Sequence, residues 1–142
     1  MEIMSFREKS TWITFVLLLA FGIYFGDVAA HMLDPTRSHG NYLQLFVLLV
    51  AAIVVLEIIT HTVIAFRSPR DAQTPIDERE RLIELRSTRP AYFVLLVGAF
   101  LSVGTIHIGA STWLLAHCVL LALWMAELTR YGSQLYHYRR GA

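Results

Sequence analysis

Two glutamates inside long apolar stretches are the residues of this chain most open to a chemical role. Glu57 lies ten residues before Arg67, and Glu127 lies twelve residues before Arg139. An ionisable group at membrane depth costs roughly 2.5–3.5 kcal/mol on insertion scales, so it is expected to face other helices or water. Two such carboxylates could exchange protons or hold a cation between helices.

Neighbouring side chains extend this candidate proton or cation site. His61 follows Glu57 by one helical turn and therefore shares its helix face. Arg130 and Tyr131 occupy the corresponding turn after Glu127. The first hypothesis for these five residues is therefore proton or cation handling.

The alternative for the same residues is structural. Glu127 would then pair with Arg130, and Glu57 would hydrogen-bond His61 or Thr60. Polar groups of this kind specify how membrane helices pack.

A second group of polar residues has the ligand types of a zinc or copper site. Asp27 and His31 are one helical turn apart, and His107 and His117 lie on either side of a later turn. Imidazole and carboxylate are common ligands of these metals. Only the Asp27-x-x-x-His31 spacing supports the site, and interfacial polar groups that meet water are the alternative.

The elements that must position these residues follow from the distribution of charge. Between Arg89 and Glu127 there are 37 residues without Asp, Glu, Lys or Arg. A single helix of that length would run about 55 Å, nearly twice a bilayer core of about 30 Å. The stretch must therefore fold back, and the small and polar residues 109–112 mark the turn.

The composition, 56% hydrophobic and 16% charged, is that of a membrane protein, because soluble domains hold about 25% charged residues. Only helices satisfy their own backbone in lipid. We expect an all-α, four-transmembrane-helix bundle that forms a single integral membrane domain over residues 1–142. The expected spans are 12–33, 42–66, 90–108 and 112–136, with a short cytoplasmic surface helix at 75–88. A signal peptide is the alternative for the first span, since Val28-Ala29-Ala30 resembles a cleavage site.

Basic residues set the expected orientation. Arg7 and Lys9 precede the first span, six arginines lie between residues 67 and 89, and Arg139 and Arg140 close the chain. By the positive-inside rule, both termini and the central connection are cytoplasmic. The expected location is the cytoplasmic (inner) membrane.

The two halves show an internal repeat. Phe15-Val16-Leu17-Leu18 recurs as Phe93-Val94-Leu95-Leu96, and Gly26 matches Gly104 at the same offset. Both hairpins would start in the cytoplasm, which predicts a parallel repeat about an axis along the membrane normal.

Small residues mark candidate helix contacts. Gly22, Gly26 and Ala30 form a ridge at intervals of four residues, and Gly98 with Ser102 forms a shorter one. Such ridges let helix backbones approach closely. Either could be the seam between the repeats or a homodimer interface.

The central connection has the form of a helix start. Thr74 is an expected N-cap, and Pro75 suits the first helical position. A solvated linker helix is one interpretation, and a docking or dimer-contact element is the other. The residues of the docking hypothesis are Asp77, Glu78, Arg79, Glu80 and Arg81.

The run 77–80 before a membrane helix and the closing Leu135-Tyr136-His137-Tyr138-Arg139-Arg140-Gly141 also carry a resemblance. The chain resembles an uncharacterised family of small prokaryotic four-helix integral membrane proteins. This resemblance implies membrane location and helix count, and it implies no activity.

No nucleophile–base pair, phosphate loop or dinucleotide fingerprint occurs, so we do not expect an enzyme. The single Cys118 excludes an intrachain disulfide, and a net charge of +1 gives no reason to expect nucleic acid. The first hypothesis is a non-catalytic membrane protein that associates with itself or a membrane partner through its helices, without a cofactor. The alternatives are a small proton- or cation-coupled transporter that uses Glu57 and Glu127, and a metal-binding membrane protein.

Overall fold

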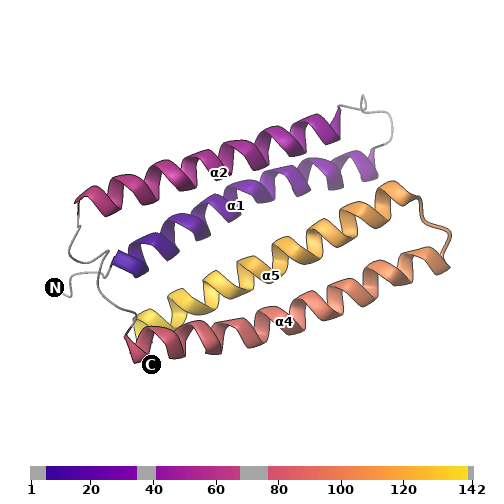
Figure 1. Cartoon of the computed structure of the whole chain (residues 1–142). Helices are drawn as coiled ribbons and strands as arrows, with labels where there is room; N and C mark the ends of the chain where they lie inside the picture. The colour runs from indigo at the N-terminus through magenta and orange to yellow at the C-terminus, as the bar shows by residue number, and fades with distance from the viewer. Residues whose placement is uncertain (1–5, 35–40, 68–76, 141–142) are drawn as a thin grey trace. The chain divides into compact units, whose positions relative to one another are not determined.

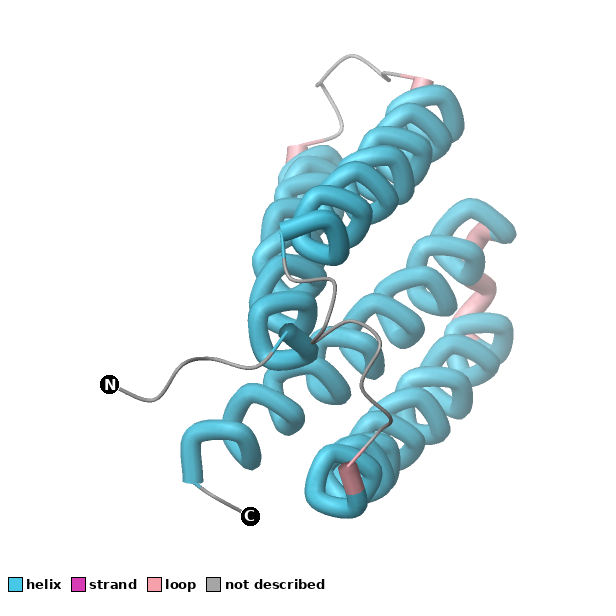
Figure 2. Tube along the Cα trace, turned by 60° about the vertical axis from the view of Figure 1, so that its left-hand side comes forward, coloured by secondary structure: helices cyan, strands magenta, loops and turns pink. Residues whose placement is uncertain are grey.

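The computed structural model describes residues 6–34, 41–67 and 77–140, and within them it contains helices and no strand (Figures 1 and 2). All four helices are long and apolar enough to cross a membrane. The prediction of an all-helical chain with four long apolar helices is therefore confirmed. The helices are α1 (Phe6–Leu33), α2 (Tyr42–Arg67), α4 (Glu78–His107) and α5 (Thr112–Arg140).

The chain divides into two compact units, Met1–Thr74 and Pro75–Ala142. The first contains the helix pair α1 and α2, which we call hairpin 1, and the second contains α4 and α5, which we call hairpin 2. Each hairpin is described by itself.

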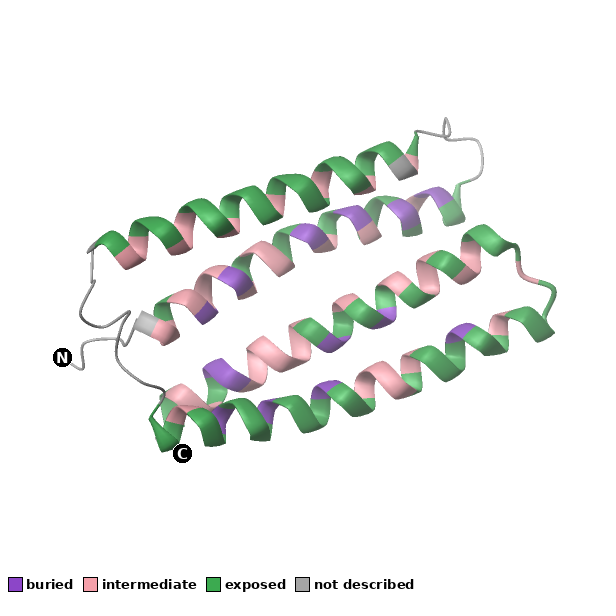
Figure 3. Cartoon of the chain, viewed as in Figure 1, coloured by how far each residue is buried: buried purple, intermediate pink, exposed green. Residues whose placement is uncertain are grey.

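In hairpin 1, α1 buries a stripe of side chains that recurs every three or four residues. Thr14, Phe21 and Val28 are spaced seven apart, and so are Tyr24 and His31, and all five are buried (Figure 3). This spacing keeps the side chains on one face of a helix.

Aromatic rings join this stripe to α2 toward the loop that connects the two helices. The Phe46 ring lies 6.0 Å from Phe21 and 5.7 Å from Tyr24 between centroids, and the His31 ring lies 5.4 Å from that of Tyr42. Edge-to-face and tilted ring pairs at these distances are favourable. The aromatic contacts fix the register of α2 against α1.

The turn of hairpin 2 lies where the sequence predicts it. Gly109 has φ +71°, and its N–H donates to the Ile106 carbonyl at 3.1 Å, while the Ala110 N–H donates to the Thr105 carbonyl at 3.1 Å. These two bonds form a Schellman motif, in which glycine takes the left-handed position because it has no Cβ. The Ser111 hydroxyl then accepts from the Leu114 N–H at 3.3 Å and caps the start of α5.

A close approach of backbones holds α4 against α5. A β-carbon at Gly98 would lie 2.5 Å from Cβ of Ala122 and 3.2 Å from its Cα. Ser87 and Ser102 are buried on α4, and their hydroxyls bond carbonyls of their own helix. These serines therefore act in the seam as small residues rather than as links between helices.

The structure differs from the prediction at residues 75–90. We predicted a surface helix over 75–88 and a separate span that enters at Pro90, but one continuous helix runs from Glu78 to His107 with Pro90 inside it. Its N-cap is Asp77, in an extended conformation. The predicted cap at Thr74 lies outside the described residues.

The reason for this continuity is a buried face that does not change direction at the proline. Ile83, Ser87 and Ala91 are buried at intervals of four residues, so the face crosses Pro90 without a break. On α5, Gln134 and Leu135 are buried just before the predicted end of the last span at 136, and the helix itself extends four residues further, to Arg140. The Arg86 carbonyl loses its helical donor at Pro90, and near a membrane boundary water can replace it.

The Gly98–Ala122 contact leads to a stability prediction. Gly98→Ala should lower the free energy of unfolding in mixed micelles by about 1–3 kcal/mol relative to Gly104→Ala, because the new methyl group overpacks the seam. Gly104 is the matched control, since a β-carbon there meets nothing within 4 Å. Adding Ala122→Gly to Gly98→Ala should recover part of the loss, and equal stability of the two single variants would contradict the close seam.

Candidate functional site

A polar cluster joins α1 to α2 in hairpin 1, at the end away from the loop that connects them. This polar cluster consists of Ser10 and Thr14 of α1 and of Glu57 and His61 of α2. The Thr14 hydroxyl donates to Glu57 Oε1 at 2.7 Å, and the Ser10 hydroxyl contacts His61 Nε2. Each helix contributes two side chains four residues apart, so one face of α1 meets one face of α2.

The hydrogen bonds assign the tautomer of the histidine. His61 Nδ1 lies 2.8 Å from the backbone carbonyl of Glu57, and a carbonyl only accepts. Nδ1 therefore carries a proton, and in the neutral ring Nε2 accepts from the Ser10 hydroxyl. The ring is held at both nitrogens, and the adjacent carboxylate is held by Thr14.

The polar cluster lies near one end of the apolar part of α1. Thr14 follows Lys9, the last charged residue before the apolar run, by five residues, or about 7.5 Å along the helix. Glu57 is at the same level because it contacts Thr14. The carboxylate therefore sits about one and a half turns from Lys9 of α1, and ten residues, or about 15 Å, from Arg67 at the end of its own helix.

In hairpin 2, Glu127 has a basic partner on its own helix. Arg130 Nη1 lies 3.7 Å from Glu127 Oε2, and Arg130 Nη2 lies 3.4 Å from Oε1 of Glu84 on α4. The Arg130 guanidinium also lies 5.7 Å from the centroid of the Tyr131 ring. Arg130 thus bridges an acid of α5 and an acid of α4.

Glu127 is also shallow and half exposed. Its side chain is 49% exposed. Ala122 lies opposite Gly98 in the antiparallel pair, so Glu127, five residues after Ala122, is level with Phe93 of α4. Phe93 in turn lies four residues, or about 6 Å along the helix, from Arg89. A carboxylate at this level, beside an arginine, has access to water or headgroups.

The two candidate proton-handling acids are therefore placed in different units. Glu57 contacts Thr14 and Glu127 contacts Arg130, each within its own hairpin. The structure brings His61 to the glutamate of hairpin 1, and Arg130 with Tyr131 to that of hairpin 2. These contacts match the structural interpretation for Glu127, while Glu57 receives its side-chain hydrogen bond from a threonine of α1 that the sequence did not single out.

The metal-ligand candidates lie in two units as well. Asp27 is exposed on α1, whereas His31 is buried against Tyr42. His107 is exposed at the end of α4, and His117 Nδ1 contacts the Trp113 carbonyl at 2.8 Å on α5. Among the residues that the structure describes, no three or more His, Cys, Asp or Glu side chains gather as a metal site would require.

The two small-residue ridges have different surroundings. Gly98 of α4 faces α5 of its own hairpin, and Ser102 is 1% exposed in the same seam. On α1, Gly26 is exposed and a β-carbon there would meet nothing within 4 Å. Gly22 and Ala30, one turn away on either side, are only partly buried. The α4 ridge is used inside hairpin 2, and the centre of the α1 ridge is open.

The predicted docking segment begins α4. Asp77, Glu78, Arg79 and Arg81 are exposed, Glu80 is partly buried, and the Arg81 N–H donates to the Asp77 carbonyl at 3.0 Å. The segment is the N-cap and first turn of a membrane-length helix rather than a separate surface helix.

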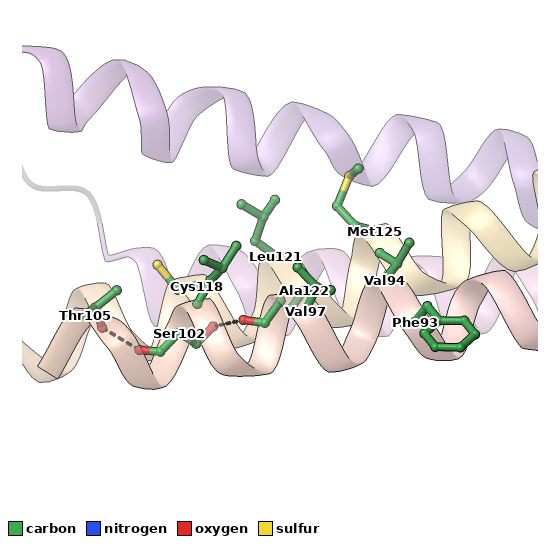
Figure 4. A pocket seen from close by; sticks show the side chains of 11 residues that line it. Phe93, Val94, Val97, Ser102, Thr105, Cys118, Leu121, Ala122 and Met125 are labelled. Atoms are coloured by element: carbon green, nitrogen blue, oxygen red, sulfur yellow. Dashed lines mark hydrogen bonds between the residues drawn. The ribbon is translucent and has the colours of Figure 1, made fainter.

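An apolar groove of about 580 Å³ runs along one face of hairpin 2 (Figure 4). Met125, Leu121 and Cys118 of α5 line one side, and Val97 and Phe93 of α4 line the other. The hydroxyls of Ser102 and Thr105 at its end are bonded to α4 carbonyls at 2.7 and 2.6 Å. The groove therefore offers apolar contact and no convergent polar group for a reaction.

Comparisons with protein-family models, with curated proteins and with solved structures find no match for this chain. The resemblance to a family of small four-helix membrane proteins stays a prediction.

Sequence reasoning missed Ser10, Thr14 and Glu84. The sequence did contain a signal for Ser10 and Thr14. These two hydroxyl residues are four apart on α1, as Glu57 and His61 are on the antiparallel helix α2, so two polar pairs of equal spacing could face each other. Glu84 was hidden inside a charged run, where any of several acids could have met Arg130.

The Thr14–Glu57 hydrogen bond should stabilise hairpin 1 measurably. Thr14→Val should lower the free energy of unfolding in mixed micelles by about 0.6–1.7 kcal/mol, because membrane hydrogen bonds between helices fall in this range. Thr62→Val is the matched control, since the exposed Thr62 hydroxyl bonds a carbonyl of its own helix. In a Glu57→Leu background the effect of Thr14→Val should vanish, and an undiminished effect there would show that this bond does not act.

Proposed function

We propose that this chain is a non-catalytic integral membrane protein that acts by helix association, with a second copy of itself or with a membrane partner. The observation that carries the proposal is the open centre of the α1 ridge at Gly26, on a helix long and apolar enough to cross a membrane. In lipid, small residues at intervals of four let another helix approach closely.

The contacts of the ionisable groups favour association over transport. Glu57 and His61 are held by hydroxyls of α1, and Glu127 is paired with Arg130. A group that carries protons or cations through a membrane must change partners along a path. Here each acid has a partner within its own hairpin: Glu57 accepts from Thr14, and Glu127 lies 3.7 Å from Arg130.

The docking segment adds a second surface to the proposal. Asp77, Glu78, Arg79 and Arg81 are exposed at the start of α4, ahead of the uncharged run that begins at Pro90. Two acidic and two basic side chains at this place suit a partner with complementary charges outside the membrane. The segment would orient the partner while the helices supply the contact area.

Location and topology complete the proposal. We place the chain in the cytoplasmic membrane with both termini inside, supported by six arginines between residues 67 and 89. The two hairpins would be parallel copies of one ancestral pair, supported by the matches at 15–18 with 93–96 and Gly26 with Gly104.

Enlarging the open glycine tests the association directly. In liposomes, donor- and acceptor-labelled full-length protein should show energy transfer that rises with protein-to-lipid ratio, and Gly26→Leu should weaken self-association about ten-fold or more, because the side chain keeps a second helix away. Gly104→Leu is the matched control: it is equally open, but Phe100 and Ile108 flank it at the same spacing, so it forms no ridge.

For a membrane partner in place of a second copy, the same two variants are compared by co-purification in mild detergent. Gly26→Leu should lose a co-purifying membrane protein that Gly104→Leu retains. Protein that is monomeric at all ratios and purifies alone would contradict the proposal, as would equal effects of the two variants.

One observation favours proton handling as a second candidate function. His61 and Glu57 share one face of α2, and the side chain of each contacts a hydroxyl of α1, while His61 Nδ1 contacts the Glu57 backbone carbonyl. This candidate rests on Glu57 and His61 alone, because Glu127 is paired with an arginine.

A further inference from the structure

We propose that the face of α4 turned away from α5 binds the headgroup of an anionic phospholipid. A recess of about 620 Å³ lies there, between Arg86 and Arg89. The proposal does not depend on helix association, and its occupant is a lipid rather than a protein. The recess is lined by Leu85, Arg86, Thr88, Arg89, Tyr92 and Phe93, and none of these residues is acidic.

The recess lies where the helix passes from charged to apolar residues. Arg89 is the last charged residue before the 37 uncharged ones, and Arg86 lies one turn earlier. Because α4 is continuous through Pro90, both guanidinium groups stay on the same helix as the apolar span. A helix that crosses the bilayer with this span places Arg86 and Arg89 at the level of the phosphates.

The face is left open by the packing of hairpin 2. Ser87 and Ala91 are buried in the seam, whereas Arg86, Arg89 and Tyr92 are exposed. Glu84 is the acidic residue of α4 that lies closest along the helix to Arg86. It forms an ion pair with Arg130 of α5. One side of α4 therefore packs against α5, and Arg86 and Arg89 are exposed on the other side.

Apolar side chains continue the recess along the span. Phe93 follows Arg86 by seven residues, and Phe100 follows Phe93 by seven, so all three share one face. Phe93 is 65% exposed and Phe100 is 71% exposed. A lipid with its phosphate at Arg86 can therefore lay its acyl chain along these rings, with Tyr92 at headgroup level, where tyrosine is common.

The arginines favour an anionic headgroup over a zwitterionic one. A guanidinium group binds phosphate oxygens through paired N–H donors. Phosphatidylglycerol keeps the negative charge of its phosphate, whereas phosphatidylcholine cancels it with a quaternary ammonium group. Each arginine near an anionic membrane surface contributes about five-fold in affinity.

The test is native mass spectrometry of the full-length protein in mild detergent, titrated separately with palmitoyl-oleoyl phosphatidylglycerol and palmitoyl-oleoyl phosphatidylcholine. The wild type should bind the first phosphatidylglycerol about 25-fold more tightly than phosphatidylcholine, at about five-fold for each arginine. The double variant Arg86→Gln/Arg89→Gln should lose about 25-fold for phosphatidylglycerol and change little for phosphatidylcholine. Circular dichroism checks that the exposed substitutions leave the helices intact.

The matched control is Arg139→Gln/Arg140→Gln, which removes the same charge at the end of α5 and should change phosphatidylglycerol affinity by less than two-fold. Arg86→Lys/Arg89→Lys keeps the charge without the paired donors and should lose less than the glutamine pair. The proposal is overturned by a wild type without lipid preference, by unchanged affinity in Arg86→Gln/Arg89→Gln, or by equal losses in the two glutamine double variants.

Discussion

The absence of water in a bilayer core is the constraint on which this structure depends. A polar group inside that layer must find its partner within the protein or face a penalty of several kcal/mol. In this chain, the hydroxyls of Ser87 and Ser102 bond carbonyls of their own helix, and Glu57 takes a hydroxyl from α1. The same requirement explains why polar side chains meet within a hairpin.

The two hairpins answer this constraint with different packing. Hairpin 1 joins its helices through aromatic rings near the loop and through the polar cluster at the other end, where Thr14 meets Glu57. Hairpin 2 brings two backbones close at Gly98 and Ala122 and bridges the charged ends with Arg130. The two hairpins therefore hold their helices together by different interactions.

The depth of the acids connects packing to function. Register from the Thr14 and Gly98 contacts places Glu57 and Glu127 each within about two turns of a charged residue on the neighbouring helix. A carboxylate near the edge of the bilayer core costs much less free energy than a carboxylate at its centre. Acids with partners inside their own hairpin suit helix packing. The surfaces for which we propose partners are the open α1 ridge, the docking segment and the arginine face of α4.

Hydropathy and charge were sufficient to predict four long apolar helices and the turn at residues 109–112, because a bilayer sets helix length and 37 uncharged residues are too many for one crossing. The continuous α4 was not predictable from Pro90 alone, since proline usually interrupts a helix. What overrides it is a buried face at 83, 87 and 91, which is visible only once α5 is known to extend alongside.

The candidate site was predicted in part for a similar reason. Spacing places His61 beside Glu57 and Arg130 beside Glu127, because these pairs lie on one helix. Spacing does not give the register between helices, so Thr14 became a partner of Glu57 only in three dimensions.

The central claim is that the ionisable groups of the spanning helices hold each hairpin together and do not move charge. The most direct measurement is proton flux into liposomes that contain the full-length protein, driven by a pH gradient with a potassium diffusion potential set to zero. The account predicts that the wild type and Glu57→Gln give the same flux as protein-free vesicles. Flux in the wild type that Glu57→Gln abolishes and Thr62→Val preserves would contradict it.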